Sequence, residues 1–208
     1  MAPTPLLPRK SSDFTPITTV HNHVSIAAPP LTVLTTVLNT TTWPSWNTYN
    51  PTATIYYRPE PVGSQPQSPS HPAALSALFA SPDFLSPGCK FGKSHSEESK
   101  KSVASVNDTE NLEILAIEEL QTEDGKRGYR IVWRLLDWNE WLMKSRRVHE
   151  FVEGENGQTE YNSWTELGGL FAWPLKWASG DSKIGVFFDE TFKSLKEFVE
   201  GGATVAVS

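Results

Sequence analysis

At 208 residues the chain is long enough for one domain, and its eight Trp and ten Phe supply large rings for a core that needs no disulfide or metal. The formal net charge of -6 and the pI of about 5.4 argue against nucleic acid or an anionic membrane as main partner, since both select a basic surface. Cys89 is the single cysteine, which fits a reducing compartment. We expect a cytoplasmic protein, because residues 1–10 lack the apolar core of a secretory signal and no run of eighteen apolar residues occurs.

The first third of the chain predicts a tail, a strand, a helix and a second strand. Residues 1–13 read as a disordered tail. From Val20 to Ile26, apolar and polar residues alternate, which is typical of a strand. Leu31, Leu34 and Leu38 then recur at helical spacing. The sequence Trp-Pro-Ser-Trp-Asn at 43–47 indicates a tight aromatic turn, and residues 52–57 are rich in strand-forming side chains.

Residues 59–87 interrupt this pattern with seven prolines, which exclude a central strand or a long helix. Within the segment, residues 73–80 predict one or two helical turns. A long irregular insertion is usually a functional loop or a disordered one. The insertion therefore predicts either a lid over a pocket or a surface loop.

The second half of the chain predicts an antiparallel meander followed by a helix. Turn signals separate short runs with strand character, which we place at 89–95, 102–106, 112–121, 129–137, 142–152 and 159–167. The spacing then changes, and apolar residues lie three or four apart between Ile184 and Val199. Gly201 and Gly202 end this amphipathic helix. A long helix packed on an antiparallel sheet is an α+β design.

The order of these elements resembles the START/SRPBCC superfamily, which includes birch-pollen-allergen-like proteins and polyketide cyclases/dehydrases. The resemblance is carried by residues 26–38, by the turn at 43–47, by Gly88, by residues 157–168, and by 192–200. Leu34 stands where this family often has Trp. The resemblance implies a helix-grip fold, with a curved antiparallel sheet of six or seven strands wrapped around the C-terminal helix. It implies one ligand-binding domain over residues 14–202, a second tail at 203–208, and a cavity between sheet and helix, but no single activity.

Strand parity predicts which side chains face this cavity, because alternate residues share a face of a strand. In the strand 142–152, the face with Lys144, Arg146 and Glu150 suits solvent, so Arg147 and His149 should point inward. Parity in the strand 159–167 leaves Tyr161 and Trp164 as alternatives, and we place Tyr161 inside. With the apolar positions of the other elements, the predicted ligand-binding residues are Asn22, Trp46, Phe91, Trp133, Met143, Phe151, Tyr161 and Phe188.

Arg147 and His149 form the constellation that suggests chemistry. Histidine can act as a general acid or base, and arginine can hold a carboxylate or stabilise an enolate oxygen. The alternative is structural: Arg147 paired with Glu113 or Glu119, and His149 bound to backbone. Two weaker candidates are a metal pair formed by His21 and His23, which lacks a third ligand, and a nucleophilic Cys89. No Gly-rich phosphate loop is present at a strand–helix junction, so we expect no bound nucleotide, and we expect no metal and no cofactor.

Three functions fit these observations. The first is a cofactor-independent cyclase, dehydratase or isomerase acting on a polyketide-like or terpenoid-like substrate in secondary metabolism. The second is a non-catalytic carrier or sensor of a lipid, quinone or sterol, which predicts a pocket with few polar groups and a mobile lid. The third is a protein-interaction module, which predicts a collapsed pocket and an exposed apolar patch. We favour binding of a small hydrophobic molecule by a monomer or homodimer and leave catalysis open, with no nucleic-acid partner and no stable membrane insertion.

Overall fold

In the computed structural model, the described residues are 14–60, 75–96, 108–174 and 183–202, and the side chains of 183–188 are not described. Among these residues, seven strands form one antiparallel sheet in the order β1-β7-β6-β5-β4-β3-β2. The strands are β1 (Thr18–Ile26), β2 (Thr52–Tyr57), β3 (Lys90–Ser94), β4 (Thr109–Gln121), β5 (Arg127–Leu135), β6 (Lys144–Glu153) and β7 (Thr159–Gly168). The curved antiparallel sheet expected from the sequence is confirmed.

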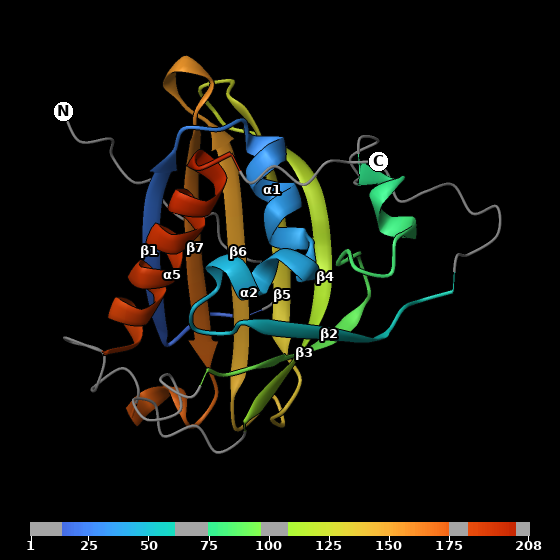
Figure 1. Cartoon of the computed structure of the whole chain (residues 1–208). Coiled ribbons are helices and arrows are strands. Elements are labelled where there is room, and N and C mark those ends of the chain that lie inside the picture. The colour runs from blue at the N-terminus through green and yellow to red at the C-terminus, as the bar shows by residue number, and fades with distance from the viewer. Residues whose placement is uncertain (1–13, 61–74, 97–107, 175–182, 203–208) are drawn as a thin grey trace.

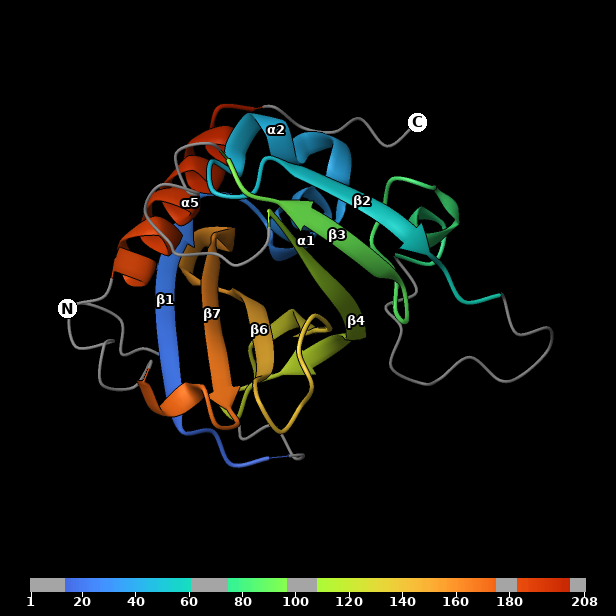
Figure 2. The same cartoon turned by 90° about the horizontal axis from the view of Figure 1, so that it is seen from below.

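Three helices lie on one side of this sheet (Figure 1): α1 (Pro30–Leu38), α2 (Trp43–Trp46) and α5 (Lys183–Glu200). α1 begins with a proline, whose fixed φ suits a first helical turn. Short 3-10 turns lie at Thr40–Thr42, Leu78–Ala80 and Glu155–Gly157, and residues 172–174 are also helical. In Figure 2 the sheet curls so that β2 and β3 come round toward α1 and α2, and β2 contacts α2. The sheet thus encloses the space that the helices cover.

β4 to β7 form the predicted meander, and β1 joins its far edge by pairing with β7. Pairing fixes the faces of the central strands: His149 lies opposite Ile131 and Ser163, and Arg147 lies opposite Trp133. Gly128 in β5 is required by this pairing, because a Cβ there would lie 2.3 Å from the Phe151 carbonyl oxygen. The strand predicted at 102–106 lies outside the described residues.

α5 is held against the β1 edge of the sheet by polar contacts along its length. Asn22 donates to Asp189 at 2.8 Å, and the Lys196 ammonium donates to the Ser25 carbonyl at 2.8 Å. Near the C-terminal end of α5, Glu200 accepts from the Ala27 amide at 2.8 Å. On the inner side of the helix, Phe192, Leu195 and Val199 are buried in the core. Two faces of α5 therefore fix its position, and the helix ends before Gly201, as the sequence predicts.

The second half of the proline-rich insertion packs into the core. Leu75, Phe84 and Leu85 are buried with the α1 residues. The Arg58 guanidinium binds the carbonyl oxygens of Pro82 and Phe84, at 2.7 Å and 2.6 Å. Residues 61–74 lie outside the described part of the chain, and no residue of 75–87 lines the cavity described below. A lid role for the insertion remains a prediction.

The convex face of β6 corrects one expectation. Arg146 and Glu150 lie on the face predicted to be exposed, yet they are 8% and 6% exposed. Glu150 accepts a hydrogen bond from Arg130 Nε at 2.8 Å, and long side chains from neighbouring strands cover the row. Trp164 is also buried on this side, where it stacks with His21. Within the described residues, no helix has both the length and the apolar composition needed to cross a membrane.

Candidate functional site

A cavity lies between the concave face of the sheet, α2 with the loop after it, and α5. It leaves about 40 Å³ for the centres of water-sized molecules. Because one water requires roughly 10–15 Å³ of such space, the cavity holds about three waters. A guest much larger than one small ring has to displace side chains. The described lining residues are Val37, Trp43, Trp46, Asn47, Tyr49, Asn50, Lys93, Trp133, Arg147, His149, Tyr161, Thr191, Phe192 and Leu195.

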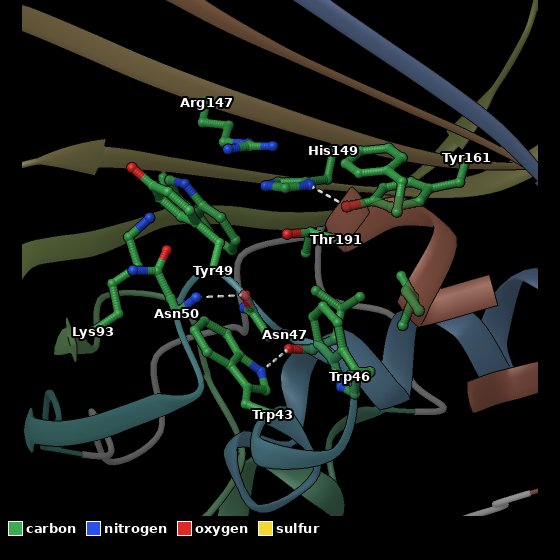
Figure 3. A pocket seen from close by; sticks show the side chains of 14 residues that line it. Trp43, Trp46, Asn47, Tyr49, Asn50, Lys93, Arg147, His149, Tyr161 and Thr191 are labelled. Carbon is green, nitrogen blue, oxygen red and sulfur yellow. Dashed lines mark hydrogen bonds between the residues drawn. The ribbon is translucent and has the colours of Figure 1, made fainter. Parts of the chain in front are cut away.

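The apolar part of the lining consists largely of indole rings. Trp43 and Trp46 come from α2 and lie below the sheet in Figure 3. Trp43 Nε1 donates to the Val37 carbonyl at 3.0 Å, and Trp46 Nε1 donates to Thr42 Oγ1 at 3.1 Å. Both indole N–H groups are thus bonded within the protein. The two rings offer a guest apolar surface rather than hydrogen bonds.

A column of parallel rings supports one wall. The Tyr161 ring stacks on Phe151 with centroids 4.7 Å apart and on Phe192 of α5 at 4.4 Å. Phe151 lies directly opposite Tyr161 in the β6–β7 pairing, so the sheet itself sets the first contact. The column fixes the Tyr161 ring from both faces and thereby positions its hydroxyl group.

That hydroxyl group binds His149. The Tyr161 oxygen lies 2.6 Å from His149 Nδ1 (Figure 3), while His149 Nε2 is buried and has no hydrogen-bond partner among the described residues. Burial, followed by the nearby charges of Arg147 and Lys93, holds the pKa of His149 well below its usual value. His149 is therefore neutral at neutral pH. Burial also raises the pKa of Tyr161, so the phenol keeps its proton.

The protonation of the pair determines what Nε2 offers. Within the described residues, the Tyr161 hydroxyl has no acceptor other than His149 Nδ1. The hydroxyl proton is therefore placed toward Nδ1, and the single proton of the neutral imidazole resides on Nε2. His149 thus offers a buried N–H donor to whatever occupies the space beside it. Its ring also lies against Trp133, with centroids 4.2 Å apart.

Arg147 is two residues before His149 on the same face of β6. Its Nε donates to Ser163 Oγ at 3.1 Å. Burial lowers the pKa of Arg147 from its ordinary value, but a guanidinium keeps its charge at neutral pH. The predicted structural alternative for Glu113 is not found, since that carboxylate binds Arg134 at 2.7 Å. Arg147 brings a positive charge to the cavity wall.

A second polar group comes from β3 and the loop after α2. Lys93 lines the cavity, and its ammonium binds Glu110 Oε2 at 2.9 Å. His95 Nε2 lies 3.4 Å from the other oxygen of Glu110, and His95 Nδ1 lies 3.1 Å from the Asn50 amide nitrogen. Lys93 and His95 hold the pKa of the Glu110 carboxyl well below its usual range, against the effect of burial. Glu110 is not among the residues that line the cavity.

Tyr49, in the loop after α2, lies beside this polar group. Its ring meets the His95 ring edge to face, with centroids 5.2 Å apart. Burial and the Glu110 charge raise the pKa of Tyr49 to about 12. The phenol is therefore neutral at physiological pH. It adds a polar but uncharged group to the wall.

The structure brings five of the predicted residues together at the cavity: Trp46, Trp133, Arg147, His149 and Tyr161. The others do not line it, for different reasons. Asn22 is bound to Asp189 of α5, Phe91 lies in the core between Trp43 and Trp133, and Phe151 is covered by Tyr161. Met143 precedes β6 in the turn closed by the Asn139 carbonyl. The side chain of Phe188 lies outside the described residues.

The predicted set lacks nine lining residues, which are the apolar Val37, Trp43, Phe192 and Leu195 and the polar Asn47, Tyr49, Asn50, Lys93 and Thr191. A signal existed for Lys93, because the alternation that turns Phe91 inward also turns Lys93 and His95 inward. The weaker candidates do not form sites. His23 binds Glu160, Cys89 is buried with a raised thiol pKa, and the described residues contain no group of three potential metal ligands.

No protein-family model and no curated protein matches the sequence. Solved structures do match the fold. A hypothetical protein from Helicobacter pylori aligns with a TM-score of 0.60 and 12% identity over 95% of this chain and 99% of its own. A point mutant of norcoclaurine synthase from Thalictrum flavum aligns with a TM-score of 0.52 and 8% identity over 92% and 100%. A Nitrosomonas europaea protein gives 0.51 and 12% over 89% and 96%.

The chain has a helix-grip fold, which is the fold that the resemblance to the START/SRPBCC superfamily implied. At these identities the likeness shows the fold alone, and the activity has to be argued from the site. In this fold, the concave side of the sheet carries the cavity, where β6 supplies Arg147 and His149 and β3 supplies Lys93. The expected fold class is confirmed, while the roles of Arg147 and His149 remain to be tested.

Proposed function

We propose that the protein binds a small apolar molecule with a carbonyl oxygen, and that Arg147 and His149 polarise this oxygen. The observation that carries the proposal is His149 Nε2, a buried nitrogen of a neutral imidazole with no partner among the described residues. A buried donor without an acceptor is costly, and a ligand oxygen removes that cost. The indole rings of Trp43 and Trp46 cover the apolar part of the guest.

Two donors on one oxygen favour chemistry in which negative charge develops there. When the α-proton of a bound ketone leaves to water, the electron pair moves into the carbonyl and the oxygen becomes an enolate. Arg147 and the His149 N–H stabilise that charge in a site with little water. Enolisation is the common step of carbonyl cyclisations, dehydrations and isomerisations, which are the reactions proposed for this cavity. The norcoclaurine synthase of the same fold was solved with a transition state analogue, so this fold carries catalysis in at least one protein.

The carrier alternative receives less support. A lipid or sterol requires far more space than about 40 Å³, and the lining includes Arg147, Lys93, Asn50 and other polar residues. The carrier hypothesis predicts a wide cavity with few polar groups. Native mass spectrometry of freshly purified protein tests it directly. A retained molecule of lipid or sterol mass would favour the carrier over the enzyme.

Proton exchange of a small ketone tests the proposed chemistry. We expect the protein to accelerate exchange of the α-protons of cyclopentanone, a single-ring ketone, in D₂O, followed by NMR, and Arg147→Gln to remove most of the acceleration. Losing one such donor costs about 10²–10³ in rate in well-studied enzymes. Arg130→Gln, on the convex face, is the matched control and should leave the rate unchanged. If the unmodified protein exchanges a panel of small ketones no faster than buffer does, the catalytic proposal is wrong.

A second candidate function, an interaction module, is favoured by one observation. Trp141, Leu170 and Trp173 are each more than half exposed. The Leu170 amide donates to the Trp141 carbonyl at 3.1 Å, which brings the two loops side by side. Exposed apolar groups gathered in this way favour association. Sedimentation across a concentration series, with Trp141→Ser as the comparison, tests whether the patch joins two copies of the chain.

A further inference from the structure

We propose that the molecule bound in this cavity carries a carboxylate, which lies between Arg147 and Lys93 while its apolar part packs on the indole rings. The inference rests on the proposed function, because it assumes that the cavity takes a guest. The inference adds to that function a prediction of the charge that the guest carries. The observation behind it is the set of charges that the cavity wall presents.

Among the described lining residues, two side chains are cationic and none is acidic. This is unusual for a chain with six more acidic than basic residues. Glu110 pairs with Lys93 and is shared with His95, but it is not among the residues that line the cavity. A guest in the cavity therefore faces the cations and not the carboxylate. Charge complementarity selects an anion.

His149 adds a third donor to the same region. Its Nε2 is buried and unpartnered among the described residues, and Arg147 and Lys93 both act on the ring electrostatically. Figure 3 shows Arg147 and His149 side by side on the sheet above Asn50 and Thr191, with Lys93 at one end. A carboxylate offers two oxygens and about four acceptor positions, enough for several donors at once. A neutral amide of the same shape offers one oxygen and brings two protons that compete with these donors.

The size of the cavity limits the class of acid. About 40 Å³ for water-sized centres, bounded by Trp43, Trp46 and Trp133, fits a single planar ring better than an acyl chain. The inferred ligand is a small aromatic or similarly flat carboxylic acid. In a reactive substrate, the carbonyl lies toward His149 and the carboxylate toward Lys93, which describes a keto acid.

Benzoate and benzamide make a matched pair for the test, because they share shape and differ in charge. We expect calorimetry at pH 7.5 to show benzoate binding about tenfold or more tightly than benzamide, the ratio given by a hydrogen bond to a charged group. Arg147→Gln and Lys93→Gln should each reduce this preference, and Lys93→Gln should leave the affinity for benzamide little changed. Arg130→Gln, whose guanidinium binds Glu150 and Glu118 on the convex face, should keep the preference.

Each outcome decides the inference. If benzamide binds as tightly as benzoate, the ligand is not selected by charge and the inference is wrong, while binding of a neutral guest still supports the proposed function. If neither compound binds, the cavity rejects single rings and both proposals fail. If the preference for benzoate survives both glutamine substitutions, other residues bind the carboxylate and the assignment to Arg147 and Lys93 is overturned. Should one variant not fold, the comparison in the unmodified protein still decides whether charge matters.

Discussion

The hydroxyl oxygen of Tyr161 lies 2.6 Å from Nδ1 of His149, and this hydrogen bond links side chains of the neighbouring strands β7 and β6. Tyr161 is held between Phe151 and Phe192, so its hydroxyl has little freedom to move away. The ring column therefore sets the tautomer of His149. The packing of the rings thus determines that His149 presents its Nε2–H group to the cavity.

Removing that hydroxyl should destabilise the fold. Tyr161→Phe leaves His149 Nδ1 buried without its partner, at a cost of about 1–3 kcal/mol in the free energy of unfolding. Urea denaturation followed by fluorescence measures this. Tyr57→Phe, at a position that is 49% exposed, should change the free energy by less than about 0.5 kcal/mol. Equal effects at the two positions would mean that the hydrogen bond contributes nothing.

The lowered pKa of His149 predicts a pH dependence of stability. The unfolded chain takes up a proton at this histidine near its ordinary pKa of 6.5, whereas the folded protein resists protonation to much lower pH. Between these values the unfolded state binds more protons, so the free energy of unfolding falls as pH drops below about 6.5. Urea melts from pH 7.5 to 5 measure the slope, and His149→Gln should flatten it.

His21 is the control for this experiment, because burial lowers its pKa as well. It lies on the convex face against Trp164. His21→Gln should remove only a smaller part of the slope, since His21 lacks the second and third causes that act on His149. A slope that disappears in His21→Gln but persists in His149→Gln would show that His21, and not His149, takes up the proton, which contradicts the prediction.

Much of the site could be predicted from strand parity. Arg147, His149 and Tyr161 lie on regular antiparallel strands, where a period of two and a local turn fix the facing of every side chain. Tyr49 and Asn50 follow no such rule. They belong to the loop after α2, and they reach the cavity only because β2 and β3 curl round the open side of the sheet. That curvature arises from contacts between distant segments, which a local pattern does not contain.

The convex face shows a second limit of parity. The rule places Arg146 and Glu150 correctly on the outer side, but it says nothing about how far the neighbouring side chains cover them. Glu150 is buried because Arg130, from the adjacent strand, reaches over it with its long side chain. A charged residue in a strand therefore predicts an exposed side chain only where the neighbouring strand carries no residue of opposite charge beside it.

The Lys93–Glu110 pair should contribute to stability. Lys93 is only 7% exposed, and Glu110→Gln removes the carboxylate that its ammonium group binds. We expect a loss of about 1–3 kcal/mol in the free energy of unfolding, less than for a fully buried pair because Glu110 is partly exposed. Thermal or urea unfolding measures it. Lys126→Gln breaks an exposed pair with Asp124 and should cost under about 0.5 kcal/mol. Similar losses in the two variants would show that burial of Lys93 has no energetic effect.

Enlarging the cavity should alter the size of ligand that it accepts. Phe192→Ala removes a buried ring that lines the cavity and stacks on Tyr161, at a cost of about 3–5 kcal/mol in stability. The space left behind adds room beside the indole rings. We therefore expect 2-naphthoate to gain affinity relative to benzoate in this variant, as measured by calorimetry at a temperature where the variant remains folded.

Val199→Ala separates the two effects of Phe192→Ala, which are the loss of stability and the added space in the cavity. Val199 is buried on the same side of α5 but does not line the cavity, so its truncation should destabilise the helix contact by about 1–3 kcal/mol without changing which acid binds better. A shift toward 2-naphthoate in both variants would show that loosening of α5, rather than the volume beside Tyr161, admits the larger ring. A shift confined to Phe192→Ala places the ligand against that ring, because only that substitution creates space inside the wall.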